Sequence, residues 1–180
     1  MKPTKPIDPS AARASRGASF AGAILATLAF SLAWPVAEAR ASDLGEQAFA
    51  RQDYVRSAGE FFRRAERGDR IAQAYLGFMY ANGRGVPQND VEAVMWLRRS
   101  SAQGYPTGQF MLGLMVDKGR GTPQDFVEAE MWLNLAASAA TPAQRDYWTR
   151  VRNAVSSKLT RAERAEAQTR ALAWAPIAER

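Results

Sequence analysis

"NGRGVPQND" spans residues 82–90 and "KGRGTPQDF" spans residues 118–126, so one turn sequence occurs twice at an offset of 36 residues. Alignment of residues 76–97 with residues 112–133 at this offset gives 14 identities in 22 positions. A fixed period of this length is typical of stacked supersecondary units, each of which buries its apolar face against its neighbours. The chain is therefore predicted to be a repeat array.

Each unit is predicted to consist of two helices joined by this turn. Apolar and small residues recur at helical spacing on both sides of it. In the first unit these are Ala72, Leu76, Met79 and Tyr80 before the turn, and Val91, Val94, Met95 and Leu97 after it. Within the turn, Gly83 can adopt the left-handed conformation that closes a helix, Gly85 can supply a second unusual backbone angle, and Pro87 stops a helix from running through. Gly-Arg-Gly-x-Pro is thus interpreted as the hinge of a helical hairpin.

Glycine also occurs inside a predicted helix of each unit, at Gly77 and Gly113. Because glycine within a helix costs about 1 kcal/mol relative to alanine, its repetition at one register predicts a neighbouring helix that crosses too closely for a side chain. Trp96 and Trp132 recur on the second helix of each unit. They are expected to be core residues that fill the space beside these glycines.

Residues 1–39 have the features of a secretory signal peptide. Basic residues precede an apolar run without charge before Glu38, and small-x-small tripeptides end it. The run is shorter than the roughly 20 residues of a spanning helix and is broken by Pro35, which favours cleavage over a retained anchor. We expect export to the periplasm, a mature N-terminus at Arg40 or Ser42, and membrane contact only before cleavage.

The composition excludes several kinds of site. The chain has no cysteine and no histidine, which removes disulfide scaffolds, thiol catalysis, imidazole zinc sites and histidine-based nucleophile pairs. We expect neither a metal nor a cofactor. Four of the 24 Lys and Arg and two of the 18 Asp and Glu precede Arg40, so the net charge of +6 falls to about +4 in the mature segment. These cations are scattered over helices, which indicates solvated faces rather than nucleic-acid binding.

Residues 40–180 are predicted to form one repeat domain. The two clear repeats occupy about residues 69–104 and 105–140, and a half-repeat without the Gly-x-Gly loop is expected at about 43–68. Two capping boxes, "TPAQ" and "TRAE", start C-terminal capping helices at about 142–173. Their polar outer faces suit a terminal unit, because only one side of it has a neighbour.

The stretch "AQAYLGFMYANGRGVPQNDVEAVMWLRRSSAQG" resembles a Sel1-like repeat, a relative of the tetratricopeptide repeat with a longer loop that contains Gly-x-Gly. "GQFMLGLMVDKGRGTPQDFVEAEMWLNLAAS" looks like a second copy. The resemblance covers about residues 69–138. It implies an all-α fold, a right-handed α-solenoid of antiparallel helix pairs with a helical C-terminal cap. It also implies a non-enzymatic adaptor or regulator that binds other proteins or peptides on its concave face.

Apolar residues outside the family's core positions recur on the first helix of each clear unit. They are Tyr75, Phe78, Met111 and Leu114. They are three residues apart within a helix and 36 apart between helices, so a solenoid would align them as one stripe on its inner surface. An exposed stripe of this kind predicts a site for a partner protein or peptide. The alternative is a C-terminal segment that folds back and covers the stripe with Leu172, Trp174 and Ile177.

A second hypothesis is a cell-envelope scaffold that engages peptidoglycan or an acidic exopolysaccharide through arginines, with salt-sensitive binding. The candidate arginines are Arg84, Arg98, Arg99 and Arg120. Catalysis is the third and least favoured class. Glu92 and Glu128 recur in the repeat register, but such recurrence is what surface pairing in a solenoid predicts.

Overall fold

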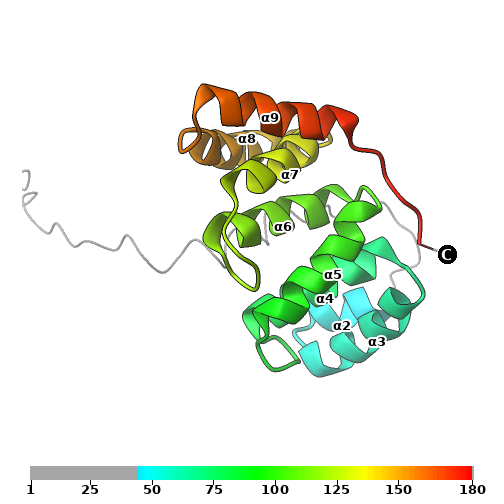
Figure 1. Ribbon diagram of the computed structural model, residues 1–180. Coiled ribbons are helices and arrows are strands. Elements are labelled where there is room, and N and C mark those ends of the chain that lie inside the picture. Colours follow the sequence, from blue (N-terminus) through cyan, green and yellow to red (C-terminus); the bar gives the residue numbers. More distant parts are fainter. Residues whose placement is uncertain (1–43, 180) are drawn as a thin grey trace, which may run out of the picture. The chain divides into compact units, whose positions relative to one another are not determined.

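The computed structural model describes residues 44–179, and these residues form eight α-helices and no strand (Figure 1). The helices are α2 (Leu44–Ala50), α3 (Tyr54–Glu66), α4 (Arg70–Asn82), α5 (Asp90–Ala102), α6 (Pro106–Lys118), α7 (Phe126–Ser138), α8 (Pro142–Ser156) and α9 (Arg161–Ala173). The described residues belong to one compact unit. The segment interpreted as a signal peptide, residues 1–39, lies outside them.

Consecutive helices pack as pairs, α2 with α3, α4 with α5, and α6 with α7. We call α2, α4 and α6 the first helices, and α3, α5 and α7 the second helices. Each pair also packs on the next, α3 on α4 and α5 on α6, while α8 and α9 both pack on α7. The fold class predicted from the repeat, an all-α solenoid of helix pairs, is therefore confirmed.

The two helices of a pair cross at the glycine of the first helix. A Cβ atom added to Gly77 would lie 2.5 Å from Leu97 Cγ and 3.2 Å from the carbonyl oxygen of Ala93. Gly113 has equivalent surroundings, with Leu133 in place of Leu97. The close crossing predicted from the two glycines is confirmed, but leucines and not tryptophans fill the space beside them.

The repeated tryptophans are core residues that face elements outside their own pair. Trp96 and Trp132 are 2% and 8% exposed. Each precedes the crossing leucine by one residue, which turns its side chain about 100° around the helix. The Trp96 ring meets Phe62 of α3 at 6.0 Å between centroids, and the Trp132 ring meets Trp174 at 6.1 Å.

The C-terminal helices close the core. Trp148 of α8 is 1% exposed and stacks on Phe110 of α6, with ring centroids 4.7 Å apart and planes 10° apart. A capping box begins each helix. At the start of α9 the Thr160 N–H donates to Glu163 Oε2 at 2.7 Å, which satisfies a backbone donor that the helix leaves open.

The first glycine of each Gly-Arg-Gly turn ends a first helix. Gly83 and Gly119 both have a φ of 64° and form the left-handed C-caps of α4 and α6. The Gly83 N–H donates to the Met79 carbonyl, which would otherwise have no partner within the helix. The hinge predicted from the turn sequence is thus observed in both units.

The second glycine of the turn joins each pair to the preceding one. Gly85 and Gly121, with φ of 72° and 71°, lie against the backbone carbonyls of Tyr54 and Asp90 at the start of the preceding second helix. A Cβ atom at either glycine would overlap that carbonyl. The sequence predicts the unusual backbone angle but not this contact.

The arginine between the two glycines reaches the same preceding helix. Arg120 Nε donates to Asp90 Oδ2 at 3.0 Å, and Arg120 Nη2 forms a second bond with Oδ1. Tyr54 occupies the position one repeat before Asp90, and Arg84 therefore lies over the Tyr54 ring, at 5.3 Å from its centroid. One turn thus closes a helix and fastens two pairs together.

We expect Gly121→Ala to destabilise the protein by about 1–3 kcal/mol, because the added methyl group must displace the Asp90 carbonyl and occupy a strained φ. Urea unfolding followed by circular dichroism measures the change. Gly59→Ala is the matched control. Gly59 lies exposed within α3, where a Cβ atom would meet nothing within 4 Å, so alanine is expected to stabilise by about 0.5–1 kcal/mol. If both changes stabilise the protein, the close contact of Gly121 with the Asp90 carbonyl would be contradicted.

Candidate partner-binding surfaces

The predicted stripe on the first helices begins in a buried aromatic cluster. Tyr75 and Phe78 of α4 are 4% and 3% exposed. Tyr75 stacks on Phe61 of α3 at 4.1 Å between centroids, and Phe49 of α2 meets Tyr75 and Phe78 edge-on at 5.2 and 5.9 Å. The preceding helix pair therefore accounts for part of this burial. Burial also raises the pKa of the Tyr75 hydroxyl above its usual range.

The other half of the stripe is half-buried. Met111 and Leu114 of α6 pack against the main apolar core. The contacts described for the C-terminal segment lie elsewhere, since Trp174 meets Trp132 and the Ile177 N–H donates to the Ala102 carbonyl. The structure thus brings the four stripe residues onto two neighbouring first helices with different burial. Their role as a partner site stays a prediction.

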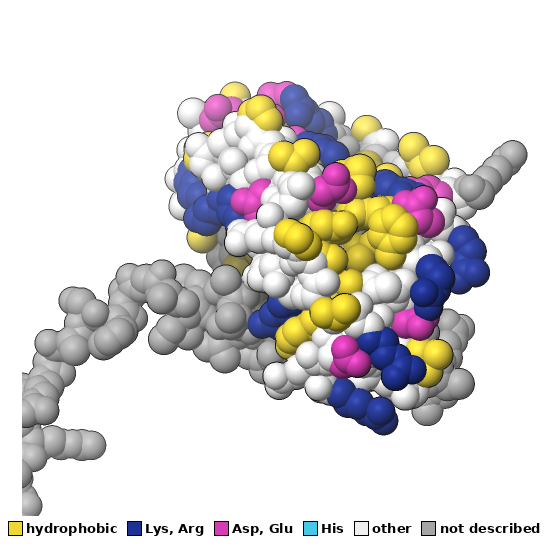
Figure 2. Space-filling view, turned by 90° about the horizontal axis from the view of Figure 1, so that it is seen from below, with side chains coloured by type: hydrophobic (Ala, Val, Ile, Leu, Met, Phe, Trp, Pro, Cys, Tyr) yellow, Lys and Arg dark blue, Asp and Glu magenta, His cyan; other side chains and the backbone are white. Residues whose placement is uncertain are grey.

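A second set of apolar side chains is exposed, and it lies on the second helices. Val55 and Phe62 of α3 are 74% and 46% exposed, and Val91 and Met95 of α5 are 65% and 41% exposed. We call these four residues the second-helix row. Figure 2 shows one face of the molecule, on which several groups of hydrophobic side chains lie among charged ones.

Sequence reasoning counted part of this row among the apolar positions of the predicted second helix. Val91 and Met95 recur one repeat later as Val127 and Met131, as faithfully as the core leucines recur. Recurrence therefore does not separate core from surface. The helical phase does, because at about 100° per residue Val91 and Met95 lie on one side of the helix and Leu97 lies on another.

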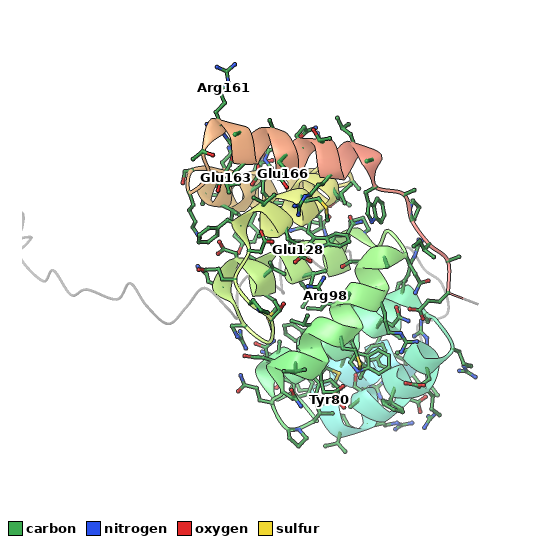
Figure 3. The ribbon with its side chains drawn as sticks, in the orientation of Figure 1. Tyr80, Arg98, Glu128, Arg161, Glu163 and Glu166 are labelled. Carbon is green, nitrogen blue, oxygen red and sulfur yellow. The ribbon has the colours of Figure 1, made fainter. Side chains whose placement is uncertain are left out.

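The arginines considered for polymer binding are all engaged within the fold. Arg98 of α5 points toward Glu128 of α7 and donates twice to its carboxylate, at 2.6 and 3.3 Å (Figure 3). The other three, Arg84, Arg99 and Arg120, contact the Tyr54 and Phe78 rings, Glu179, and Asp90, respectively. The contacts of Arg84 with Tyr54, Arg98 with Glu128 and Arg120 with Asp90 connect successive units, which gives the recurrence of Arg84/Arg120 and the placement of Glu128 a structural role.

A cleft of about 420 Å³ with both polar and apolar lining lies between α7, α8 and α9. Arg145 and Arg152 of α8 line it, together with Asn134 of α7 and Gln168 of α9. Within the part of the chain that the structure describes, neither arginine forms an ion pair. The cleft therefore presents two cations that form no ion pair with a carboxylate of the described residues.

Glu130 of α7 is buried near Arg152 and Arg164, with 5% of the residue exposed. Its Oε2 atom has no hydrogen-bond partner among the described residues. Burial raises the pKa of the Glu130 carboxyl, and this effect outweighs the hydrogen bond with Ser156 and the charges of Arg152 and Arg164, which lower it. The fold therefore holds a proton on Glu130 more tightly than the unfolded chain does.

This shift predicts a pH-dependent effect of Glu130→Gln. The folded protein disfavours the ionised form of Glu130. The free energy of unfolding of the native chain therefore falls as pH rises from about 4 through the raised pKa, where Glu130 ionises. The variant cannot ionise here and should gain stability relative to the native chain over that rise. Urea midpoints at several pH values between about 4 and about 7 measure the difference.

Glu163→Gln is the control of opposite sign. Hydrogen bonds from Thr160 lower the pKa of Glu163, so its ionised form contributes stability that is lost as pH falls through the lowered pKa. Its variant should therefore be less stable than the native chain near neutral pH and equal to it in acid. If the urea midpoints of the native chain and of Glu130→Gln change in parallel with pH, the raised pKa of Glu130 would be contradicted.

Residues 44–179 contain no cluster of three or more acidic side chains arranged to hold a metal ion. In the same residues no helix combines the length and apolar character needed to cross a bilayer. The features that remain are surfaces of a helix-pair solenoid.

Comparisons with known proteins agree with this class. A profile of the Sel1 repeat matches residues 70–105 and 106–140. Among solved structures the chain is similar to c5321, described as a protective antigen present in uropathogenic Escherichia coli strains displaying an SLR fold. The identity is 26% and the TM-score 0.67, over 73% of this chain and 28% of that one. A Sel1 repeat protein from Oxalobacter formigenes is 30% identical with a TM-score of 0.51, over 59% of this chain and 84% of that one. No curated protein matches the chain.

The chain belongs to the Sel1 repeat family. Proteins built from Sel1 repeats are generally protein-interaction modules, and their fold is typically a non-catalytic scaffold. This chain spans 28% of the length of c5321.

Proposed function

We propose that this protein is a non-enzymatic periplasmic interaction module that binds a partner protein on the surface of its solenoid. The observation that carries the proposal is the second-helix row. Each of its four side chains is at least 41% exposed, although core packing in a solenoid needs apolar residues only on the buried sides of its helices. Phe62 of α3 meets Trp96, the sequence neighbour of Met95 on α5, at 6.0 Å between ring centroids, so part of the row on the two helices lies close together, as an apolar interaction site requires.

The arrangement of the row suits a helical or flat apolar partner surface. Val91 and Met95 are one turn apart on α5, and Val55 lies one repeat earlier on α3. α3 and α5 both pack on α4. The row is therefore carried by two helices held against a common neighbour, so binding would not require the scaffold to reorganise.

Location in the periplasm is supported by the sequence of residues 1–39, with its basic start, short apolar run and Ala-x-Ala endings. The relative c5321 is described as a protective antigen, which accords with an exported protein. If this proposal is correct, mass spectrometry of the protein recovered from a periplasmic fraction will find an N-terminus at Arg40 or Ser42. Recovery of the chain with residues 1–37 intact would favour a membrane anchor.

The binding proposal predicts the behaviour of a row variant in which Val91→Ser and Met95→Gln are combined. Capture of partners from an envelope extract should fall at least about tenfold, while the free energy of unfolding changes by less than about 1 kcal/mol, because exposed positions contribute little to folding. Leu172→Ser is the matched control, since Leu172 is 77% exposed but lies on α9, away from the row. Equal capture by the row variant and the native chain would contradict the use of this surface.

The same assay tests the first-helix stripe. Met111→Ser removes a half-buried stripe residue, and Tyr75→Ser removes a buried one. If the stripe binds the partner, Met111→Ser should lower capture more than it lowers stability. A large loss of stability with Tyr75→Ser and unchanged capture with Met111→Ser would leave the stripe with a packing role only.

An envelope polymer is a second candidate ligand, and the cleft bordered by Arg145 and Arg152 favours it. Neither arginine forms an ion pair with the described residues, so both can bind an acidic sugar, with an affinity that falls as the salt concentration rises. Binding of purified peptidoglycan or acidic exopolysaccharide that is lost when Arg145→Gln and Arg152→Gln are combined, but not in the row variant, would favour the polymer over a protein partner.

A further inference from the structure

The chain after α9 returns along the ends of the second helices. Residues 174–179 leave α9 in an extended conformation, with Trp174 at ψ of 138° (Figure 1). The Trp174 ring and Pro176 lie over Gly104, and Glu179 lies over Gly68. We call residues 174–179 the tail. We call the surface under it, formed by Gly68, Gln73, Arg99, Ala102 and Gly104, the edge groove.

The edge groove recognises the tail through both backbone and side chain. The Ile177 N–H donates to the Ala102 carbonyl at 2.8 Å. The Glu179 carboxylate accepts from Arg99 Nη2 at 2.8 Å, from Arg99 Nε at 3.1 Å and from Gln73 Nε2 at 2.8 Å. Charge-assisted bonds of this kind are about twice as strong as neutral ones. The bonds from Arg99 also hold the pKa of Glu179 below its usual range.

The groups that bind the carboxylate are held in place by the repeats themselves. The Arg99 guanidinium lies 4.6 Å from the centre of the Trp96 ring, and Arg99 Nη2 also donates to the Ala65 carbonyl at 3.3 Å. Gln73 is fully buried and is bonded to Ala65 O and to the Gln103 side chain. Arg99 and Gln73 are thus positioned for a carboxylate by contacts that do not involve the tail.

Two glycines at equivalent positions of successive repeats leave the floor of the edge groove without side chains. Gly68 and Gly104 are 36 residues apart, with φ of 85° and 76°, a conformation that favours glycine. A Cβ atom at Gly104 would lie 3.3 Å from both Pro176 and the Trp174 ring. The floor therefore lets the side chains of the tail approach its backbone closely, which a side chain at either glycine would prevent.

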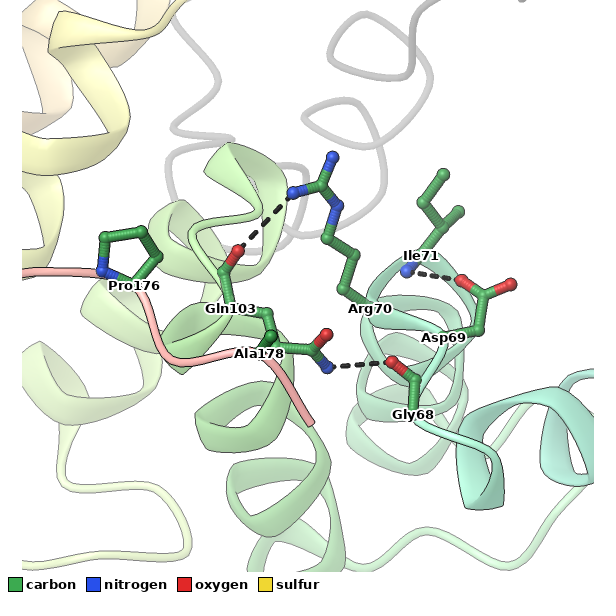
Figure 4. A pocket seen from close by; sticks show the side chains of 7 residues that line it. All are labelled: Gly68, Asp69, Arg70, Ile71, Gln103, Pro176 and Ala178. Atoms are coloured by element: carbon green, nitrogen blue, oxygen red, sulfur yellow. Dashed lines mark hydrogen bonds between the residues drawn. The ribbon is translucent and has the colours of Figure 1, made fainter. Parts of the chain in front are cut away.

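Trp174 packs against the core, but the rest of the tail occupies the groove as a ligand would. Ile177 is 71% exposed, and its neighbours 175, 176 and 178 are exposed too. A cleft of about 480 Å³ remains beside it, lined by Gly68, Asp69, Arg70, Ile71, Gln103, Pro176 and Ala178 (Figure 4). The tail is thus held by a few directed contacts and leaves much of the adjacent space open.

We propose that the edge groove is a binding site for an extended peptide segment of a partner protein that carries a proline and, three residues later, a glutamate. The tail, with Pro176 and Glu179, occupies this site in cis and competes with the partner. Because the tail is tethered, its effective concentration is high, so the native chain binds such a peptide weakly until the tail is displaced. This site shares no residue with the second-helix row, although both border Trp96, and it does not depend on the function proposed for the row.

A peptide of residues 171–180, ALAWAPIAER, labelled with a fluorophore at its N-terminus, is the probe, and full-length chains are the receptors. Glu179→Gln weakens the tail and leaves the groove intact. It should raise the affinity for the probe at least about tenfold over the native chain, measured by fluorescence anisotropy. The combination of Glu179→Gln with Arg99→Gln should abolish this gain. A probe with glutamine at the position of Glu179 should bind Glu179→Gln about tenfold more weakly than the native probe.

Arg99→Lys, combined with Glu179→Gln, is a milder change to the groove and should give intermediate affinity, because lysine keeps the charge but not the two-point geometry. Thermal melting of each chain shows that the groove variants remain folded. No gain for Glu179→Gln, or an equal gain with and without Arg99→Gln, would overturn the proposal. Dimers of the native chain that disappear with Glu179→Gln would also overturn it, in favour of tails exchanged between two copies. The assay uses no envelope extract and no row residue, so its outcome is independent of the row.

Discussion

The approach of one backbone to another, at Gly85 on Tyr54 and Gly121 on Asp90, is the constraint on which the rest of the structure depends. A solenoid contains few contacts between distant units, so its shape follows from the contact between each unit and the next. Here that contact needs a residue without a side chain and with a positive φ. Once it is made, the arginine beside the glycine lies within reach of the preceding second helix.

The period of 36 residues made the fold predictable, because the ends of α4 and α6 follow from Gly83 and Gly119 at one fixed position of the repeat, and Pro87 and Pro123 separate them from the next helix. The close helix crossing also followed from Gly77 and Gly113. The identity of the neighbour did not. Leu97 and Trp96 are adjacent and both large, and only the rotation of the helix decides which of them faces the glycine.

The surfaces were less predictable than the fold, for a related reason. A repeat preserves core and surface positions with the same period, so the recurrence of Val91 and Met95 carried no information on exposure. The burial of Tyr75 depends in part on Phe49 and Phe61, which lie in the weakest unit, where the repeat pattern says least. The contact of Glu179 with Arg99 spans 80 residues and has no counterpart elsewhere in the repeat.

The two joints of the array differ in chemistry although they share a backbone geometry. At one joint Arg120 faces the carboxylate of Asp90, with side chains 39% and 30% exposed, and at the other Arg84 faces the ring of Tyr54. Dissolved ions screen a partly exposed pair of opposite charges, whereas an aromatic ring carries no net charge to be screened. Rising ionic strength is therefore expected to weaken the junction of α5 with the pair that follows it more than the junction of α3 with the pair that follows it.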